Sequence, residues 1–116
     1  MTIYHAALPD DWRAAEAAGS YRISTRGRSL DEEGFIHASH ARQVAAVANR
    51  FYADVDELVL LAIDPDALGA PVVEESPTGD PADDRFPHIY GPIPLAAVVS
   101  ATPWRRGAAG WVFPSR

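Results

Sequence analysis

Alternating apolar and polar positions at the start of the chain predict a strand followed by a helix. Residues 2–7 alternate and are rich in β-branched and aromatic side chains, which is typical of a strand that carries His5. Pro9 suits the first position of a helix, and Gly19 suits its end. We therefore expect the first helix between these two residues.

A second helix is predicted over residues 41–52. Val44, Val47, Ala48 and Phe51 follow the three-and-four spacing of a buried stripe. The stretch "GFIHASH" comes before it, and we expect a short strand over residues 35–38 with Ser39 as the helix cap.

The second half of the chain predicts mainly strands. "LVLLAID", residues 58–64, is apolar on both alternating faces, as in a central strand that is covered on both sides. Further strands are expected at 71–75 and 111–113, and a strand or short helix at 95–101. Residues 76–85, "SPTGDPADDR", show no apolar periodicity and predict a long, mobile loop. Because strands outnumber helices without regular alternation, the pattern favours an α+β fold.

Composition limits the class of protein. The 116 residues suit one domain over residues 1–116, and the 47% hydrophobic fraction suits a globular core. A formal charge of −6 disfavours a partner made of duplex nucleic acid. The chain has no cysteine, its first residues lack the features of a signal peptide, and no apolar run is long enough for a membrane span. We expect a cytoplasmic protein that does not enter the membrane.

The segment "RFPHIYGPIP" at 85–94 is a stiff ribbon that carries His88 and Tyr90. Prolines fix φ and bias the preceding residue to extended geometry, so the ribbon loses little entropy on binding a ligand. We expect His88 and Tyr90 to orient a polar ligand, with the long loop as a lid. The alternative is a structural brace, with His88 hydrogen-bonded to the backbone.

The four histidines are the main candidates for chemistry, and we considered a metal site first. Three imidazoles with Glu74 or Glu75 would suit zinc or iron, but the chain has no HxH or HExxH spacing. We therefore assign no metal ligands, and metal-dependent hydrolysis is the least favoured activity. A histidine can equally pin a turn through a backbone carbonyl, which is our interpretation of His40.

Other common sites lack their motifs. The chain has no GxSxG elbow, no GxGxxG after a strand and no GxxxxGK[ST], which excludes a serine-hydrolase elbow and the usual dinucleotide and P-loop sites. Aromatic residues such as Tyr52 and Tyr90 could stack on a ligand ring, whereas we expect Trp12 and Trp104 in the core.

Several blocks together resemble the bacterial domain-of-unknown-function family 952. These blocks are "IYH" at 3–5, "EGFIHAS" at 33–39, "QVAAVANRFY" at 43–52, "LVLLAID" and "FPHIYGPIPLAAV" at 86–98. The resemblance implies a small α+β fold similar to that of ADP-ribosyltransferases and RNA 2′-phosphotransferases. Such a fold has two small mixed or antiparallel sheets, packed with two main helices.

The resemblance also implies roles for residues. In the ADP-ribosyltransferase pattern, a histidine on the first core strand holds the ribose of NAD, and His5 matches it. Glu75 matches the glutamate of the later strand, with Glu74 as the alternative. In the middle position the chain has His37 and Ser39, where a transferase often uses a tyrosine. The transfer needs a carboxylate near an oxocarbenium-like ribose, and we expect His5, His37 and Glu75 to carry it.

Two functions therefore remain open from the sequence. The first is a pocket that binds or processes NAD, ADP-ribose or a phosphorylated nucleoside, in which Ser39, Tyr52, His88 and Tyr90 contact the ligand. The second is a binding module on the same fold without catalysis. Neither requires a tightly held cofactor, because NAD or ADP-ribose would be the substrate or the ligand.

Overall fold

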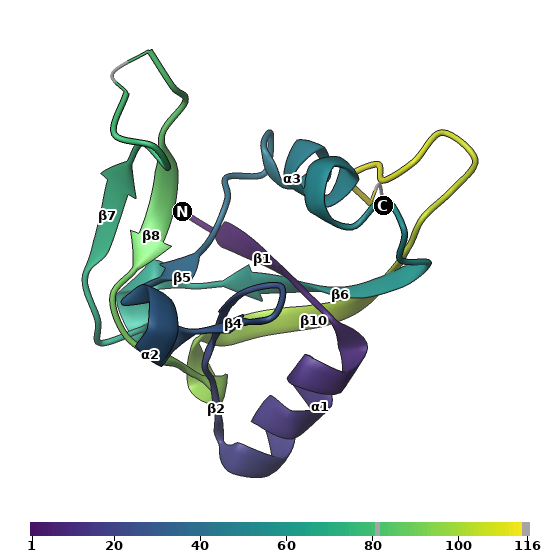
Figure 1. The fold of residues 1–116 in the computed structure, drawn as a ribbon. Coiled ribbons are helices and arrows are strands. Elements are labelled where there is room, and N and C mark those ends of the chain that lie inside the picture. The colour runs from purple at the N-terminus through teal and green to yellow at the C-terminus, as the bar shows by residue number, and fades with distance from the viewer. Residues whose placement is uncertain (81, 115–116) are drawn as a thin grey trace.

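The computed structural model describes residues 1–80 and 82–114, and the α+β class predicted from the sequence is confirmed (Figure 1). The helices are α1 (Pro9–Ala18), α2 (Leu30–Glu33) and α3 (Val44–Phe51), with 3-10 turns η1 (Pro65–Ala67) and η2 (Leu95–Ala97). The strands are β1 (Ile3–Ala7), β2 (Ser20–Tyr21), β3 (Ile23–Thr25), β4 (Arg28–Ser29), β5 (Ile36–His37), β6 (Glu57–Ile63), β7 (Val72–Glu75), β8 (Phe86–Ile89), β9 (Ile93–Pro94) and β10 (Val98–Arg105).

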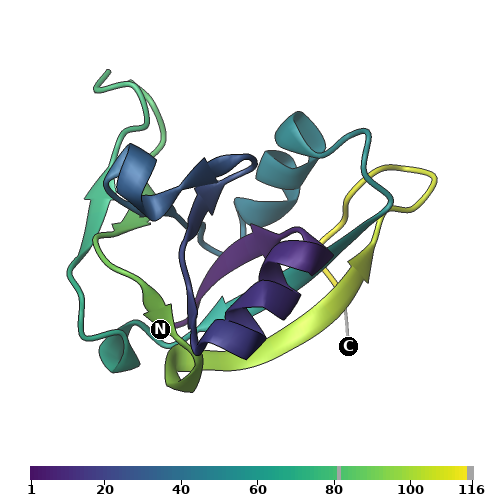
Figure 2. The same cartoon turned by 60° about the horizontal axis from the view of Figure 1, so that its bottom comes forward.

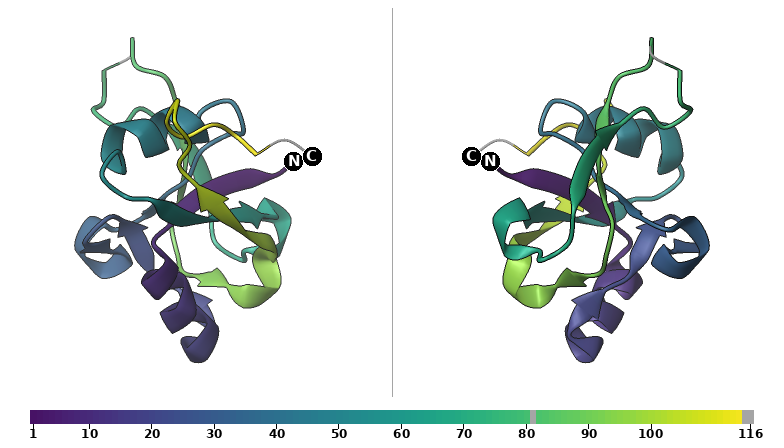
Figure 3. Two further views of the ribbon diagram at one scale, coloured as in Figure 1. Left: turned by 90° about the vertical axis from the view of Figure 1, so that its right-hand side faces the viewer. Right: turned by 90° about the vertical axis from the view of Figure 1, so that its left-hand side faces the viewer.

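The first sheet is built around β6, as its apolar sequence predicts. β6 lies between β1 and β10 and pairs antiparallel with both. One face of the sheet packs against α3, in a cluster that includes Ala6, Val44, Ala48, Leu58 and Leu60. The other face packs against α1, in a cluster that includes Ile3, Ala7, Ala15, Leu61 and Ile63. The two main helices therefore cover opposite faces of this sheet (Figures 1 and 3).

Helix α1 has the predicted bounds, whereas α3 begins later than predicted. Gly19 follows α1 with a φ of 93° and donates its N–H to the carbonyl of Ala15, which closes the helix. Figure 2 shows α1 running along the sheet. The cap assigned to Ser39 is wrong, because the backbone of Ser39 instead forms a bridge with Tyr4, with both N–H···O distances at 2.8 Å.

The second three-stranded sheet has β8 at its centre, between β5 and β7, and all its pairs are antiparallel. Residues 86–89 of the stiff ribbon are therefore the central strand of a sheet, although they include Pro87. Its register places His88 opposite His37, and the Tyr4–Ser39 bridge ties the end of this sheet to the edge of β1.

The number of sheets differs from the prediction. Where two small sheets were expected, residues 1–80 and 82–114 form four, since β2 pairs with β9 and β3 pairs with β4 besides the two three-stranded sheets. The polar segment between Gly19 and Gly34 gave little periodic signal, yet it contains three short strands and α2. A reciprocal capping box between Ser29 and Glu32 fixes the start of α2.

The strand predicted at 111–113 is wrong, because Trp111 is held by side-chain contacts instead. Its indole N–H donates to the carbonyl of Tyr52 at 2.9 Å, and its backbone N–H donates to Oδ1 of Asn49 at 2.7 Å. These bonds anchor the end of the chain against α3. None of the helices in the described part of the chain has the length and apolar composition to cross a membrane.

Candidate functional site

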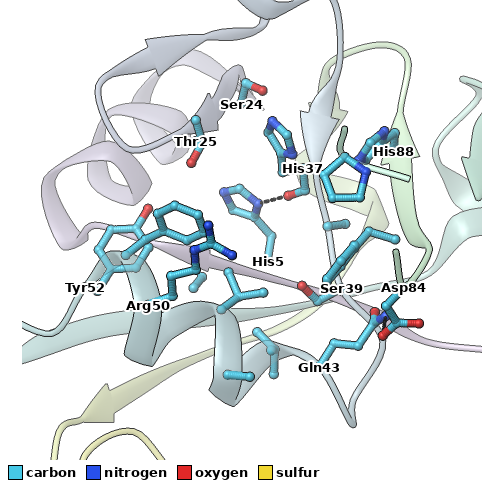
Figure 4. A pocket seen from close by; sticks show the side chains of 18 of the residues that line it. His5, Ser24, Thr25, His37, Ser39, Gln43, Arg50, Tyr52, Asp84 and His88 are labelled. Carbon is cyan, nitrogen blue, oxygen red and sulfur yellow. Dashed lines mark hydrogen bonds between the residues drawn. The ribbon is translucent and has the colours of Figure 1, made fainter. Parts of the chain in front are cut away.

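A cavity of about 540 Å³ lies between α3, the edge of β1 and the segments that carry β3 and β5 (Figure 4). This volume falls in the range of small-molecule sites. Its polar lining consists of His5, Ser24, Thr25, His37, Ser39, Arg42, Gln43, Arg50, Tyr52, Thr78, Asp84 and His88. The predicted site residues His5, His37, Ser39, Tyr52 and His88 therefore share one cavity, whereas Glu75 and Tyr90 are not among its lining residues.

His5 is buried and uses both ring nitrogens within the protein. Nδ1 donates to the carbonyl of His37 at 2.5 Å, because a carbonyl can only accept. Nε2 must then accept, and the hydroxyl of Tyr21 donates to it at 2.9 Å. Burial lowers the pKa of His5 to about 4, so the ring is neutral at pH 7. The role predicted for His5, holding a ribose, stays a prediction, but in this arrangement neither nitrogen is available for it.

His88 is equally buried but uses only one ring nitrogen. Its Nδ1 lies 2.9 Å from Oε1 of Glu75, so a carboxylate acceptor places the proton on Nδ1. Its Nε2 has no solvent-accessible area and no hydrogen-bond partner among the described residues. The ring of Phe35 stacks on that of His88, with the centroids 4.2 Å apart. The structural brace considered for this segment would have His88 hydrogen-bonded to a backbone carbonyl. In the structure, its Nδ1 is instead bonded to the carboxylate of Glu75.

Glu75 stands behind His88 and outside the cavity. The same oxygen, Oε1, also accepts a hydrogen bond from the hydroxyl of Tyr90 at 2.5 Å. The bonds from Tyr90 and then from His88 lower the pKa of Glu75, and the bond to Glu75 raises the pKa of Tyr90. Glu74 points elsewhere, to Nε2 of His40 at 2.8 Å. Of the two glutamates, only Glu75 is therefore hydrogen-bonded to a histidine that lines the cavity.

His37 lies beside His88 because the two are register partners on neighbouring strands. Their ring centroids are 5.1 Å apart, edge to face. The side chain of His37 is 35% exposed, and its Nε2 has only a 3.5 Å contact with Oε1 of Glu33. Burial lowers the pKa of His37 below its usual value. His37 is therefore the more loosely held of the two rings.

Ser39 and Tyr52 line opposite sides of the cavity (Figure 4). Ser39 is buried, and within the described ranges no protein group is hydrogen-bonded to its hydroxyl. Tyr52 is also buried, and burial raises its pKa to about 12, so the phenol is neutral. Both side chains can therefore present a neutral hydroxyl to a ligand.

Sequence reasoning missed four residues that shape this site: Tyr21, Gln43, Arg50 and Asp84. Gln43 donates to Oδ2 of Asp84 at 2.8 Å and accepts from the backbone N–H of His40 at 2.8 Å. Hydrogen bonds from Arg42 and Gln43 lower the pKa of Asp84 to about 2. Helical spacing could have found two of the four, because Gln43 and Arg50 lie seven positions apart and so share one helix face.

Arg50 differs from the other arginine of the lining. Arg42 is paired with Asp84 at 3.0 Å, whereas Arg50 has no carboxylate partner within residues 1–80 and 82–114. Its guanidinium lies 5.3 Å from the ring centroid of Phe51, a half-exposed residue that was predicted to be buried. Figure 4 shows Arg50 and Tyr52 on one side of His5, and Ser39, Gln43 and Asp84 on the other. Arg50 therefore brings a positive charge to the cavity.

The same side chains also bear on the metal site that the histidines first suggested. Over the described part of the chain, no group of three or more His, Cys, Asp or Glu side chains is arranged to hold a metal ion. His5, His37 and His88 line a common cavity, but His88 is bonded to Glu75 and His5 to Tyr21. These contacts make the histidines hydrogen-bonding groups.

Solved structures of one bacterial protein are similar to this chain. The crystal structure of CC0527 from Caulobacter crescentus is 29% identical, with a TM-score of 0.80 over 96% of this chain and 92% of that chain. Its solution NMR structure is 30% identical, with a TM-score of 0.77 over 95% and 90%. No curated protein matches the chain. The family model described as "Protein of unknown function (DUF952)" matches residues 6–101, and the chain therefore belongs to this family.

Proposed function

We propose that the cavity binds a nucleotide-type ligand, such as ADP-ribose, NAD or a phosphorylated nucleoside, without ribosyl transfer. The observation that carries this proposal is the guanidinium of Arg50, which lines the cavity without a carboxylate partner in the described chain. The chain as a whole carries a charge of −6, so an uncompensated cation at a cavity marks a place for an anion. Guanidinium groups bind phosphate oxygens through paired, charge-assisted hydrogen bonds.

The rest of the lining supports a ligand with both a ring and hydroxyl groups. Phe51 and Tyr52 offer aromatic surface, and Ala46 and Val47 of the same helix add apolar surface. Ser39 adds a hydroxyl group to the lining. A mainly apolar cavity with a few polar groups is typical of cofactor and nucleotide sites.

Binding without transfer is favoured by the position of the carboxylates. Ribosyl transfer needs a carboxylate beside the reacting sugar carbon. Within residues 1–80 and 82–114, Asp84 is the one carboxylate of the lining, and Arg42 and Gln43 already hold it. Glu75, the residue predicted for this task, lies behind His88. The proposal therefore takes the alternative in which the fold keeps a ligand cavity but lacks the transferase chemistry.

Isothermal titration of the full chain with ADP-ribose and with NAD tests the proposal. We expect saturable binding of at least one of them and no release of nicotinamide from NAD. Arg50→Gln should weaken binding about tenfold, the cost of about one charge-assisted hydrogen bond. Arg22→Gln is the matched control, because Arg22 is an exposed arginine that does not line the cavity.

Two results would contradict this function. Absence of binding to both probes, or equal affinities of the Arg50 and Arg22 variants, would remove the phosphate site. Release of nicotinamide at a rate above that of a buffer blank would support ADP-ribosyl transfer instead, and would return Glu75 to consideration as the carboxylate.

A further inference from the structure

We propose that Nε2 of His88 accepts a hydrogen bond from a ribose hydroxyl of the bound ligand, and that Glu75 is the positioning residue for this contact. The inference rests on the proposed function and names the part of the ligand that His88 recognises. It starts from one atom: Nε2 of His88 is buried and has no hydrogen-bond partner among residues 1–80 and 82–114. A buried polar atom without a partner destabilises the fold, so such atoms are rare unless a ligand or another group completes them.

The contacts of the other nitrogen define what Nε2 can bind. Because Glu75 accepts from Nδ1, and Nε2 faces no acceptor among the described residues to which a second proton could be donated, we assign the ring proton to Nδ1 and a lone pair to Nε2. A lone pair selects a donor, such as a sugar hydroxyl, and rejects a phosphate oxygen. Two residues of the lining thus bind different parts of the ligand: the guanidinium of Arg50 binds an anionic group, and Nε2 of His88 accepts from a hydroxyl.

Glu75 and Tyr90 hold this arrangement from outside the cavity. The hydroxyl of Tyr90 donates to the same carboxylate oxygen that accepts from His88, at 2.5 Å. From the residue that precedes β5, the stacked ring of Phe35 limits rotation of the imidazole. A carboxylate behind a histidine fixes both its tautomer and its orientation, which is how such pairs act in many sites.

His37 is the cover through which the ligand reaches Nε2. The lone pair has no accessible area in this arrangement, and the ring of His37 packs against that of His88 with centroids 5.1 Å apart. The ring of His88 is held by its hydrogen bond to Glu75 and by stacking with Phe35. The side chain of His37 is 35% exposed, and its Nε2 has one contact, at 3.5 Å, with Oε1 of Glu33. Because His37 is the less firmly held of the two rings that pack against His88, we expect its rotation to uncover the acceptor.

Nitrogen NMR of the ¹⁵N-labelled full chain tests the inference without relying on activity. Long-range ¹H–¹⁵N spectra distinguish the two ring nitrogens of each histidine. In the ligand-free protein we expect His88 as the Nδ1–H tautomer. On addition of ADP-ribose, the Nε2 signal of His88 should move upfield, towards the position of a hydrogen-bonded nitrogen, while the signals of the outlying His40 stay in place.

Matched variants of two neighbouring glutamates give the second readout. Glu75→Gln removes the charged acceptor of His88, whereas Glu74→Gln removes that of His40. Both glutamates lie partly exposed on β7, so both variants should keep the melting temperature of the parent chain. We expect Glu75→Gln to bind ADP-ribose about tenfold more weakly with an altered His88 tautomer, and Glu74→Gln to bind as the parent chain does.

The outcomes of these experiments distinguish a failure of the His88 contact from a failure of the proposed binding function. If ADP-ribose binds and shifts the signals of Tyr52 and Arg50 while Nε2 of His88 does not move, the inference is wrong and the binding function stands. Equal affinities of the two glutamine variants, or an Nε2–H tautomer in the ligand-free chain, would overturn it in the same way. If neither ADP-ribose nor NAD binds, the proposed function fails first and the inference fails with it.

Discussion

The two buried histidines of this cavity, His5 and His88, have the same burial but opposite hydrogen-bonding. His5 lies on β1, and both of its nitrogens are used, one by Tyr21 and one by the carbonyl of His37. His88 lies on β8, and only one of its nitrogens has a partner in the described chain. Similar burial therefore accompanies two different hydrogen-bonding states, and the number of satisfied ring nitrogens is what distinguishes His88 from His5.

The surroundings explain the difference. The bonds of His5 reach across two segments, because Tyr21 follows α1 and His37 belongs to the second sheet. Its imidazole therefore ties the edge of the first sheet to the second. The bond of His88 stays within one sheet, from β8 to Glu75 on the adjacent β7. The β1 side of the cavity is thus a fixed wall, whereas on the β8 side one ring nitrogen of His88 has no partner in the described chain.

The largest expected effect is that of His5→Ala on stability. The substitution leaves the hydroxyl of Tyr21 and the carbonyl of His37 without partners and opens a cavity, so the free energy of unfolding should fall by about 3–4 kcal/mol. Urea denaturation followed by tryptophan fluorescence measures it. His40→Ala is the control, since His40 is partly exposed and its hydrogen bond to the partly exposed Glu74 is worth about 1 kcal/mol or less. Unchanged stability with loss of ADP-ribose binding would make His5 a ligand contact instead.

The pH dependence of stability gives the next largest effect. The pKa of His5 is lowered from 6.5 to about 4 in the folded chain. Between these values the unfolded state binds the extra proton, so the stabilisation is complete above pH 6.5 and is lost as pH falls towards 4, by about 3 kcal/mol in all. His37, whose pKa is also lowered, adds to the loss in the same direction.

The measurement is a set of urea titrations from pH 7 to pH 4.5, with His5→Ala as the comparison. The parent chain should lose stability steeply over this interval, and the variant should show a shallower slope because only one of the two imidazoles with a lowered pKa remains. Carboxylates with lowered pKa values, such as Glu75 and Asp84, contribute mainly below about pH 4.5, outside this interval. Parallel slopes in the two proteins would contradict the neutral, doubly bonded state of His5.

Sequence patterns located most of the fold because they report burial. The doubly apolar run at 58–64 became the central strand β6, and Pro9 and Gly19 marked the ends of α1. The pairing of backbone segments was harder to predict from the sequence. Ser39 has a side chain typical of a helix cap, yet its backbone is hydrogen-bonded to that of Tyr4 at the edge of the first sheet. The sequence around Ser39 does not show that β1 lies next to it in the fold. That neighbour determines the backbone hydrogen bonds of Ser39.

The site was predictable by residue type but not by partner. Sequence reasoning selected His5, His37 and His88, and all three line the cavity. It placed Glu75 beside the reacting sugar, while the structure places that carboxylate behind His88. The tautomer of a histidine depends on which atoms lie within about 3 Å, and those atoms come from segments far apart in the chain. Tyr21, 16 positions from His5, carried no motif that pointed to it.

The smallest effect tests a single hydroxyl at the fixed wall. Tyr21→Phe removes the donor to Nε2 of His5 and leaves a buried nitrogen unpaired, like that of His88, at a cost of about 1–2 kcal/mol. Tyr4→Phe is the matched control, because Tyr4 lies on β1 beside His5 and no hydrogen bond of its hydroxyl occurs in the described ranges. Chemical denaturation at pH 7 compares the two. If Tyr21→Phe lowers the free energy of unfolding no more than Tyr4→Phe does, an unpaired imidazole nitrogen does not destabilise this fold. The unpartnered Nε2 of His88 would then be no evidence for a ligand. A clear difference would show that the protein gains stability from completing such an atom, which is the physical reason to expect that the ligand completes His88.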